Sequence, residues 1–325
     1  MGATEAAGQL QSREQLSDQG MSNRAIAADV AEGRLVKVHT GWFVRGSAWR
    51  AAQAEARHRL QVLAAHRQLR GADPFVLCSA AVLHDLPLHR ISPRRVHMAS
   101  LTSDGRTRPP VGRRPLVARH EMRIPDSDLC EVDGIVCTTR ERTVFDLARL
   151  SPREAGISVA DAALRQVAWD SASWAYATAA AGEWHELMRT RVMRAAGARG
   201  IRRARFILPF ADGRAQLPGE SVSRLYLADM GFHVPRLQVP IRGPDGTWYY
   251  VDFDLGSAWG EFDGRVKYKA QDKDDAMAVL QAEKERQDWI HGTTHRPIAR
   301  WGFAHMPTAA ALARRLAAFG VYPRR

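Results

Sequence analysis

The sequence predicts a mixed α/β protein built in three parts, and three observations support this prediction. Its 325 residues exceed the usual size of a single domain. Hydrophobic residues make up 45% and charged residues 25%, which is typical of a folded globular chain. Helical and strand-like patterns also change along the chain, from a helix-rich start to an alternation of helices and strands near its end. We therefore expect divisions at residues 1–50, 51–210 and 211–325.

The first part, residues 1–50, has the element order of a winged helix-turn-helix. A short helix is expected over residues 11–19, and Gly20 then provides a turn. Ser22 is a suitable N-cap for a second helix, and residues 35–45 alternate as a β-hairpin. In such modules the second helix enters the major groove of DNA. The side chains that we expect to contact phosphates and base edges are basic: Arg24, Arg34, Lys37 and Arg45.

The central part, residues 51–210, is predicted to be an α+β region. Thr138 and Glu141 have the spacing of a capping box at the start of a helix that ends at Leu150. The expected elements are helices over 51–70 and 79–86, strands over 96–99, 116–119 and 134–138, and further helix to about 205.

The last part, residues 211–325, is predicted to be an α/β domain of its own, because helices and strands alternate in it. A helix is expected over 218–230, with Gly231 at its C-terminal end. The remaining expected elements are strands over 236–242, 248–255 and 259–268, a helix from Asp272 to Gly292, a strand over 297–303 and a helix over 308–319.

The charge balance favours a polyanionic partner. Lys and Arg number 47 against 35 Asp and Glu, which gives a net charge of +12. The excess is clustered, with nine arginines in residues 90–123 and seven in residues 189–205. A positive surface attracts DNA, because neutralised phosphates release counterions. The alternative is an arginine-rich composition inherited from a high-GC genome, so the charge supports double-stranded DNA as the partner without proving it.

The cysteines and the hydropathy indicate a cytoplasmic protein. Cys78, Cys130 and Cys137 form no disulfide framework, and no Cys/His spacing in the sequence predicts a zinc site, so we expect buried thiols. The longest uncharged stretch, residues 171–182, is too short to cross a bilayer, and no secretory signal is visible. No glycine-rich phosphate loop occurs either, so we expect no membrane association and no small-molecule cofactor.

The densest group of acids lies in the last part of the chain. Asp252 and Glu261 occupy alternating positions on two neighbouring predicted strands, with Asp254 and Asp263 two residues after them. Carboxylates that face each other across a sheet repel unless a cation neutralises them, and Mg²⁺ is a suitable cation. Such a metal activates water for phosphodiester hydrolysis. The alternative is a solvated polar strand face. Two further residues complete the candidate catalytic set: Glu220 and Lys267.

Several strings resemble a known family of regulators. They are Val251-Asp252-Phe253, Gly260-Glu261-Phe262-Asp263-Gly264-Arg265-Val266-Lys267-Tyr268, Ala282-Glu283-Lys284 and Ala299-Arg300-Trp301, together with the stretches 38–43, 79–84, 132–135 and 139–147. Residues 14–319 are similar to actinobacterial proteins that join an AbiEi-type antitoxin N-terminal region to a C-terminal domain resembling very-short-patch-repair nucleases.

The resemblance implies a PD-(D/E)xK-like fold for residues 211–325, with Asp252 and Glu261 as ligands of Mg²⁺. It also implies transcriptional autoregulation and a cognate toxin protein as a partner. One position departs from the family pattern: Asp263 stands where active nucleases of this type usually carry lysine. Unless Lys267 replaces that amine, the group that activates water is missing.

Three functions are therefore compatible with the sequence. The leading hypothesis is a DNA-binding transcriptional regulator of the antitoxin type, whose nuclease-like domain is degenerate. The second is a metal-dependent DNA endonuclease that uses Asp252, Glu261 and Lys267. The third is a protein-binding antitoxin without catalysis. The basic residues of the expected wing favour the first hypothesis, and Asp263 disfavours the second.

Overall fold

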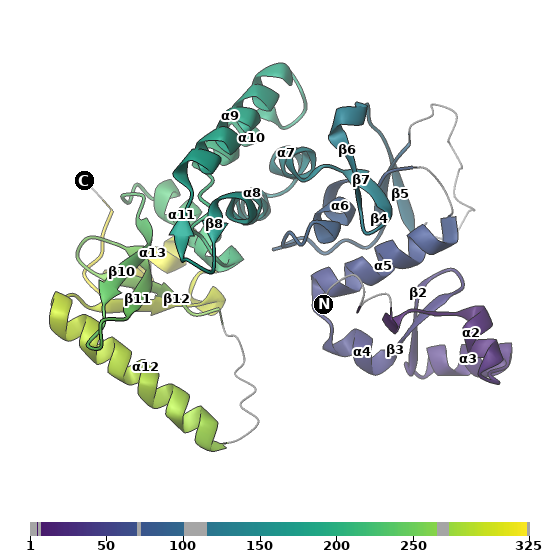
Figure 1. Cartoon of the computed structure of the whole chain (residues 1–325), viewed down its shortest axis with the longest axis horizontal. Helices are drawn as coiled ribbons and strands as arrows, with labels where there is room; N and C mark the ends of the chain where they lie inside the picture. Colours follow the sequence, from purple (N-terminus) through teal and green to yellow (C-terminus); the bar gives the residue numbers. More distant parts are fainter. Residues whose placement is uncertain (1–4, 6–7, 70–72, 101–115, 265–272, 324–325) are drawn as a thin grey trace. The chain divides into compact units, whose positions relative to one another are not determined.

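The computed structural model has a mixed α/β fold composed of two compact units, shown in Figure 1. It describes residues 5, 8–69, 73–100, 116–264 and 273–323. The first unit contains Met1–Val159 and Leu187–Pro209, and the second contains Ala160–Glu186 and Phe210–Arg325. In the part of the chain that is described, no helix has both the length and the apolar composition needed to cross a membrane.

The first unit begins with two helices and a hairpin. Strand β1 (Gln11–Ser12) precedes helices α2 (Arg13–Asp18) and α3 (Asn23–Ala31), and strands β2 (Leu35–His39) and β3 (Trp42–Arg45) follow. The three strands form one antiparallel sheet in the order β1-β3-β2. The expected helix over 11–19 is thus shorter, because residues 11 and 12 pair with β3.

Side-chain caps and a small core explain why these elements form. Ser12 and Gln15 make a capping box at the start of α2, and the Ser22 side chain accepts a hydrogen bond from the Ala25 backbone at the start of α3. Four buried apolar side chains then hold the helices against the sheet: Leu16, Ile26, Leu35 and Phe43. The expected turn of the hairpin is present, with Gly41 at φ +74°.

The remainder of the first unit contains helices and two small sheets. Helix α6 (Leu77–Leu83) is followed by the parallel pair β4 (Val96–Ser100) and β5 (Val117–Glu121), and by the antiparallel hairpin of β6 (Leu129–Val132) and β7 (Ile135–Thr138). The other elements are α4 (Gly46–Ala51), α5 (Ala54–Leu69), η1 (Asp126–Asp128), α7 (Arg140–Leu150), α8 (Arg153–Ala168), α9 (Thr178–Arg194) and α10 (Ile201–Phe210), of which α8, α9 and α10 extend across the boundary between the units.

Two details of this region correct the sequence-based prediction. The helix expected over 51–70 begins only at Ala54, since the backbone is extended at Ala52, where α4 ends. Thr139, rather than Thr138, caps α7 by accepting a hydrogen bond from the Arg142 backbone. Thr138 is instead the last residue of β7, and its hydroxyl lies 2.7 Å from that of Thr143.

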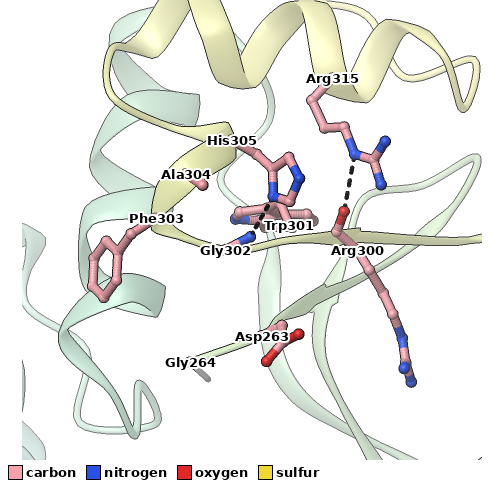
Figure 2. Close-up of a pocket in the computed structure, with 9 residues that line it drawn as sticks. All are labelled: Asp263, Gly264, Arg300, Trp301, Gly302, Phe303, Ala304, His305 and Arg315. Atoms are coloured by element: carbon pink, nitrogen blue, oxygen red, sulfur yellow. Dashed lines mark hydrogen bonds between the residues drawn. The ribbon is translucent and has the colours of Figure 1, made fainter. Parts of the chain in front are cut away.

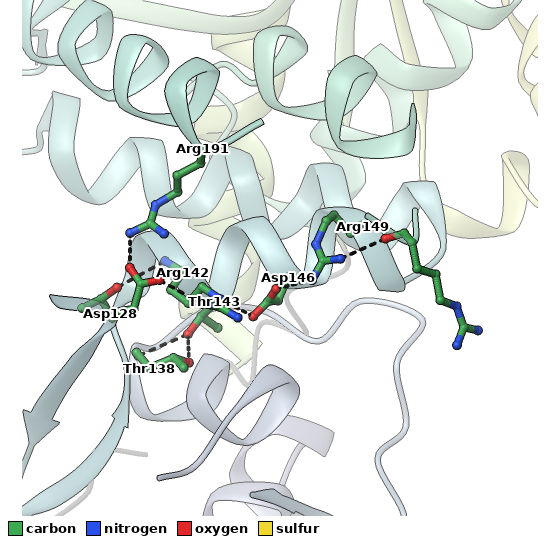
Figure 3. Close-up of polar contacts among 9 residues, drawn as sticks. Asp128, Thr138, Arg142, Thr143, Asp146, Arg149 and Arg191 are labelled. Carbon is green, nitrogen blue, oxygen red and sulfur yellow. Dashed lines mark hydrogen bonds and ion pairs between the residues drawn. The ribbon is translucent and has the colours of Figure 1, made fainter. Parts of the chain in front are cut away.

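Buried ion pairs connect three segments of the first unit, as Figure 3 shows. Asp128 pairs with Arg142 at 2.9 Å and with Arg191 at 2.5 Å, while Asp146 pairs with Arg142 at 2.7 Å and with Arg149 at 2.6 Å. Although burial raises the pKa of Asp128, hydrogen bonds from Arg191 and Arg142 hold it below its usual value. Arg191, in the basic stretch 189–205, therefore has a structural role.

The second unit is built around a four-stranded sheet in the order β10-β11-β12-β13. Strands β10 (Arg236–Arg242), β11 (Trp248–Asp254) and β12 (Trp259–Phe262) are antiparallel neighbours, and β13 (Ile298–Trp301) runs parallel to β12. The other elements are β8 (Trp169–Asp170), β9 (Ala175–Tyr176), α11 (Pro218–Asp229), α12 (Lys273–Thr294), η2 (Phe303–His305) and α13 (Ala309–Ala317). The expected order of helix, three strands, helix, strand and helix is confirmed.

Two apolar clusters stabilise this sheet. Residues of α11 and α13 pack with Phe253, Phe262 and Trp301. Ile290 of α12 packs with Val251 and with residues of the other strands. Strand β12 ends at Phe262, so the predicted strand does not include Asp263 and Gly264. The rest of its predicted length, residues 265–268 with Lys267, lies outside the described residues.

Candidate functional site

The first candidate site is the basic surface of the N-terminal helices and hairpin. Arg24 lies in the first turn of α3, Lys37 in β2 and Arg45 at the end of β3, and all three side chains are exposed. None of them forms an ion pair with an acid in the described part of the chain. Three of the four predicted DNA-contacting residues therefore present their charge to solvent.

Arg34 differs from the other three because its charge is already neutralised. It forms an ion pair of 2.6 Å with Asp29 and a second one with Glu32. Both partners lie within five residues of Arg34, on α3 and at its C-terminal end. The structure thus places Arg34 in a local ion-pair network, and a DNA contact would require it to exchange these partners.

Arg13 is a further basic residue at this surface that the sequence analysis did not select. Its guanidinium donates a hydrogen bond of 2.6 Å to Asn23 at the start of α3 and lies over the Phe43 ring, 5.8 Å from the ring centroid. These contacts fix a positive charge between α2 and α3. The available signal was its basic side chain in the predicted helix over 11–19, which belongs to the same module as the four selected basic residues.

The second candidate site contains the acids of the second unit. Glu220, in the first turn of α11, is 2% exposed and accepts hydrogen bonds from the Gln216 backbone at 3.0 Å and from the Gln238 amide at 3.4 Å. The same amide nitrogen of Gln238 donates to Asp252 at 3.1 Å. Gln238 therefore bridges the two carboxyl groups, and its φ of +50° is rare for a residue other than glycine.

Burial changes the protonation of this pair. It raises the pKa of Glu220 to about 8, and the negative charge of Asp252 contributes to the increase. Burial likewise raises the pKa of Asp252 to about 6. The hydrogen bond from the Phe262 backbone lowers this pKa, and the negative charge of Glu261 raises it further. At neutral pH these pKa values favour one proton on the pair, held by Glu220.

Glu261 has a different environment, although it is close enough to raise the pKa of Asp252. Its two carboxylate oxygens form ion pairs with Arg286 at 2.8 Å and with Arg300 at 2.5 Å. The Arg286 contact lacks hydrogen-bond alignment, so it is purely ionic. Arg300 is the direct neighbour of Glu261 in the parallel β12–β13 ladder. Both arginines also pair with Glu283, so the Glu261 carboxylate belongs to a network of two acids and two guanidinium groups.

This arrangement does not fit the two-ligand magnesium site that the resemblance implies. A cation placed between these acids would meet the two guanidinium groups that contact both oxygens of Glu261, and one oxygen of Asp252 already accepts the Phe262 backbone hydrogen bond at 2.8 Å. Magnesium binding and phosphodiester cleavage therefore stay predictions from the resemblance.

Asp263 lines an open pocket of about 430 Å³ that Figure 2 shows. Its backbone donates a hydrogen bond of 2.7 Å to the carbonyl of Trp301, which places it at the end of the parallel ladder. The pocket is lined by Asp263, Gly264, Arg300, Trp301, Gly302, Phe303, Ala304, His305 and Arg315. Glu220 and Asp252 meet through Gln238 and Asp263 lines this pocket, whereas Lys267 lies outside the described residues.

Sequence analysis missed Gln238, Arg286 and Arg300 in this second site. No sequence pattern indicated Gln238, because its contact with Asp252 depends on a positive φ inside a strand. The two arginines could have been noticed, because the acid-rich strand β12 needs counter-charges and basic residues occur on the following helix and strand. Their pairing with Glu261 depends on the β12–β13 register, which a sequence pattern does not specify.

Comparison with known proteins gives a limited result. No family model matches the chain. Two uncharacterized proteins, from two strains of Mycobacterium tuberculosis, are each 32% identical to it over 178 residues. The match covers 55% of this chain and 59% of each relative, so the chain spans about three fifths of the length of the curated relatives it matches.

Proposed function

We propose that the protein is a DNA-binding regulator whose N-terminal helices and hairpin form a winged helix-turn-helix. The observation that carries the proposal is the exposed, unpaired charge of Arg24, Lys37 and Arg45 on the β1-α2-α3-β2-β3 arrangement. In winged modules the first turn of the second helix approaches base edges, and the hairpin approaches the phosphate backbone. Arg24 lies in the first turn of the second helix, and Lys37 and Arg45 lie on the hairpin.

Two further features support DNA as the partner. The net charge of +12 provides long-range attraction for a polyanion. The exposed side of α3 also carries small residues such as Ala27, Ala28 and Ala31, so the helix has no bulky side chain that would prevent its approach to a groove. The antitoxin role and a cognate toxin partner stay part of the proposal through the resemblance alone.

Cleavage of DNA is the weaker alternative. The order of α11, three antiparallel strands, α12 and a parallel fourth strand is compatible with a nuclease-like domain. Its acids, however, are arranged as a buried pair that holds a proton and an arginine-bound glutamate. Such a set binds no metal without rearrangement, so we favour binding over catalysis.

The proposal is tested by fluorescence anisotropy with a labelled duplex taken from upstream of the gene for this protein, with a shuffled duplex of equal length for comparison. If the protein neutralises about six phosphates, its affinity should fall by about a thousandfold between about 50 and about 200 mM salt. Arg24→Ala combined with Arg45→Ala should weaken binding by about 1–3 kcal/mol per base-contacting arginine. Both side chains are exposed, so the fold should be retained.

Arg314→Ala is the matched control, because it removes an equally exposed arginine from α13 in the other unit. It should bind as the parent does. A second comparison, Arg202→Ala combined with Arg205→Ala, tests the exposed arginines of α10. If only that variant loses binding, the N-terminal module is not the DNA-binding surface. Gel analysis of the same samples with Mg²⁺, Mn²⁺ or EDTA detects cleavage, which would favour the nuclease hypothesis.

A further inference from the structure

The β6–β7 hairpin brings two cysteines and a histidine together in the first unit. Cys130 and Cys137 are direct cross-strand partners, because the turn at Asp133 and Gly134 (φ +50° and +76°) places them in register. His84, which ends helix α6, lies beside them. The Sγ atoms of Cys130 and Cys137 are 3.8 Å apart, and the His84 Nε2 atom is 4.0 and 3.8 Å from them, respectively.

These distances match the edges of a metal-centred tetrahedron. With metal–sulfur bonds of about 2.3 Å and metal–nitrogen bonds of about 2.0 Å, tetrahedral zinc separates two sulfurs by about 3.8 Å and a sulfur from a nitrogen by about 3.5 Å. The observed sulfur–sulfur distance agrees, and the nitrogen needs to move by only a few tenths of an ångström. We propose that His84, Cys130 and Cys137 form a binding site for a zinc ion.

Zinc is the cation that this donor set selects. Thiolate and imidazole ligands favour zinc over hard cations such as Mg²⁺ and Ca²⁺, which prefer oxygen. Three protein ligands leave one tetrahedral position, which a water molecule fills. Cys137 is buried, whereas Cys130 and His84 are half-buried, so the ion enters from the side of the latter two residues. The positive charge of Arg140 also acts on His84, and the negative side chains of Glu141 and Asp85 oppose it, so the surroundings of the imidazole are of mixed charge.

The hydrogen bond of His84 is compatible with this assignment. Its Nε2 atom lies 2.7 Å from the Thr138 carbonyl, to which it donates as an N–H group. Binding of zinc replaces that proton, and because Nε2 has only one in-plane bonding direction, the ring must turn from the carbonyl toward the two sulfurs, so the carbonyl would lose this partner. The Thr143 hydroxyl donates to the same carbonyl at 3.2 Å, so the oxygen stays satisfied. The cost of leaving a buried polar group without a partner is therefore avoided.

The site would fasten the hairpin to the end of α6. Cys130 and Cys137 lie on the β6–β7 hairpin, and His84 directly follows α6, so one ion connects the hairpin with a segment 46 residues before Cys130. This inference does not depend on DNA binding, and each proposal can fail while the other holds. A disulfide between Cys130 and Cys137 is the competing use of the two thiols; a bonded pair has its sulfurs about 2.05 Å apart.

The test uses the untagged, reduced full-length chain after removal of metals with a chelator. Co²⁺ should produce the sulfur-to-cobalt charge-transfer absorption and the intense visible bands of a tetrahedral thiolate site. Zn²⁺ should abolish both at one equivalent. Cys130→Ser and His84→Gln should each lower zinc affinity by more than about a hundredfold, since loss of an outer-shell partner alone costs about 10–100-fold. The glutamine amide can still donate to the Thr138 carbonyl, which preserves the local packing.

Cys78→Ala is the matched control, because it removes the third cysteine, which lies inside α6 and outside the cluster. It should bind zinc as the parent does. Zinc should also slow the alkylation of Cys130 in the parent protein. This measurement does not depend on the folding of any variant. The proposal is overturned if Co²⁺ produces no charge-transfer band in the reduced chain, or if Cys130→Ser binds zinc as tightly as the parent. A Cys130–Cys137 disulfide in a chain whose reduced form gives no such band would identify a redox pair instead.

Discussion

Replacing Glu220 with glutamine should change the pH dependence of stability in a defined direction. The pKa of Glu220 rises from 4.5 to about 8 in the folded protein because the carboxyl is buried beside Asp252. A raised pKa means that the folded state holds a proton that the unfolded chain releases. The stability from this group is thus fully present below about pH 4.5 and is lost as the pH rises through about 8.

The magnitude follows from the size of the shift. At about 1.4 kcal/mol per pKa unit, the change from 4.5 to about 8 corresponds to about 5 kcal/mol over the whole titration. About 3 kcal/mol of this falls between about pH 5 and about pH 8. Glu220→Gln mimics the protonated acid and keeps an oxygen for the Gln216 backbone hydrogen bond. As the pH rises from about 5 to about 8, the free energy of unfolding of the variant should therefore increase by about 3 kcal/mol relative to that of the parent.

The measurement is urea unfolding followed by circular dichroism at both pH values, with EDTA present so that no divalent cation neutralises the pair. At each pH the free energy of unfolding of the parent is subtracted from that of the variant. The value at about pH 5 is then subtracted from the value at about pH 8, which cancels packing effects that do not depend on pH. Glu285→Gln is the control, because the Glu285 carboxylate is exposed on α12 and its loss reports charge removal alone. A difference that is flat with pH, or that has the opposite sign, would refute the proposed burial of Glu220 beside Asp252.

Three further outcomes are expected. Gly219→Ala should destabilise the second unit by about 1–3 kcal/mol in urea unfolding, because the added methyl would lie 1.9 Å from the Phe262 ring; parental stability would contradict this close packing. Arg224→Met should cost about 3–5 kcal/mol, since it leaves the buried carboxyl of Asp161 without the cation 3.5 Å away. The stability lost through Arg224→Met should be smaller in a chain that also carries Asp161→Asn. An equal loss with and without Asp161→Asn would show that the two side chains do not interact energetically. Asp252→Asn should bind DNA as tightly as the parent in the anisotropy assay. A loss of affinity as large as that of the Arg24→Ala, Arg45→Ala variant would show that the acids take part in binding.

Local patterns in the sequence were sufficient to predict much of the secondary structure. The Ser22 cap, the Gly41 turn and the helix that begins at Pro218 depend on interactions within a few residues, and each is present in the structure. The strands of the second unit were also recognisable, because Val251 and Phe253 alternate with acids along β11. Arg24 and Arg45 could be selected as exposed cations for the same reason, since surface exposure follows from the local pattern.

Tertiary structure alone decided which side chains meet, because those contacts join residues far apart in the chain. The contact of Glu261 with Arg286 and Arg300 depends on the pairing of β12 with β13 and on the placement of α12. The raised pKa values of Glu220 and Asp252 depend on burial, which neither residue type predicts.

The cysteine cluster lies between these two cases. The Asp133-Gly134 turn is a recognisable local signal that places Cys130 opposite Cys137, although spacing rules for zinc sites do not include it. The approach of His84, 46 residues before Cys130, is set by the packing of α6 near β7. Sequence patterns encode contacts within a helical turn or a hairpin, whereas contacts between separate elements depend on the global minimum of packing and electrostatic energy, which only the folded chain defines.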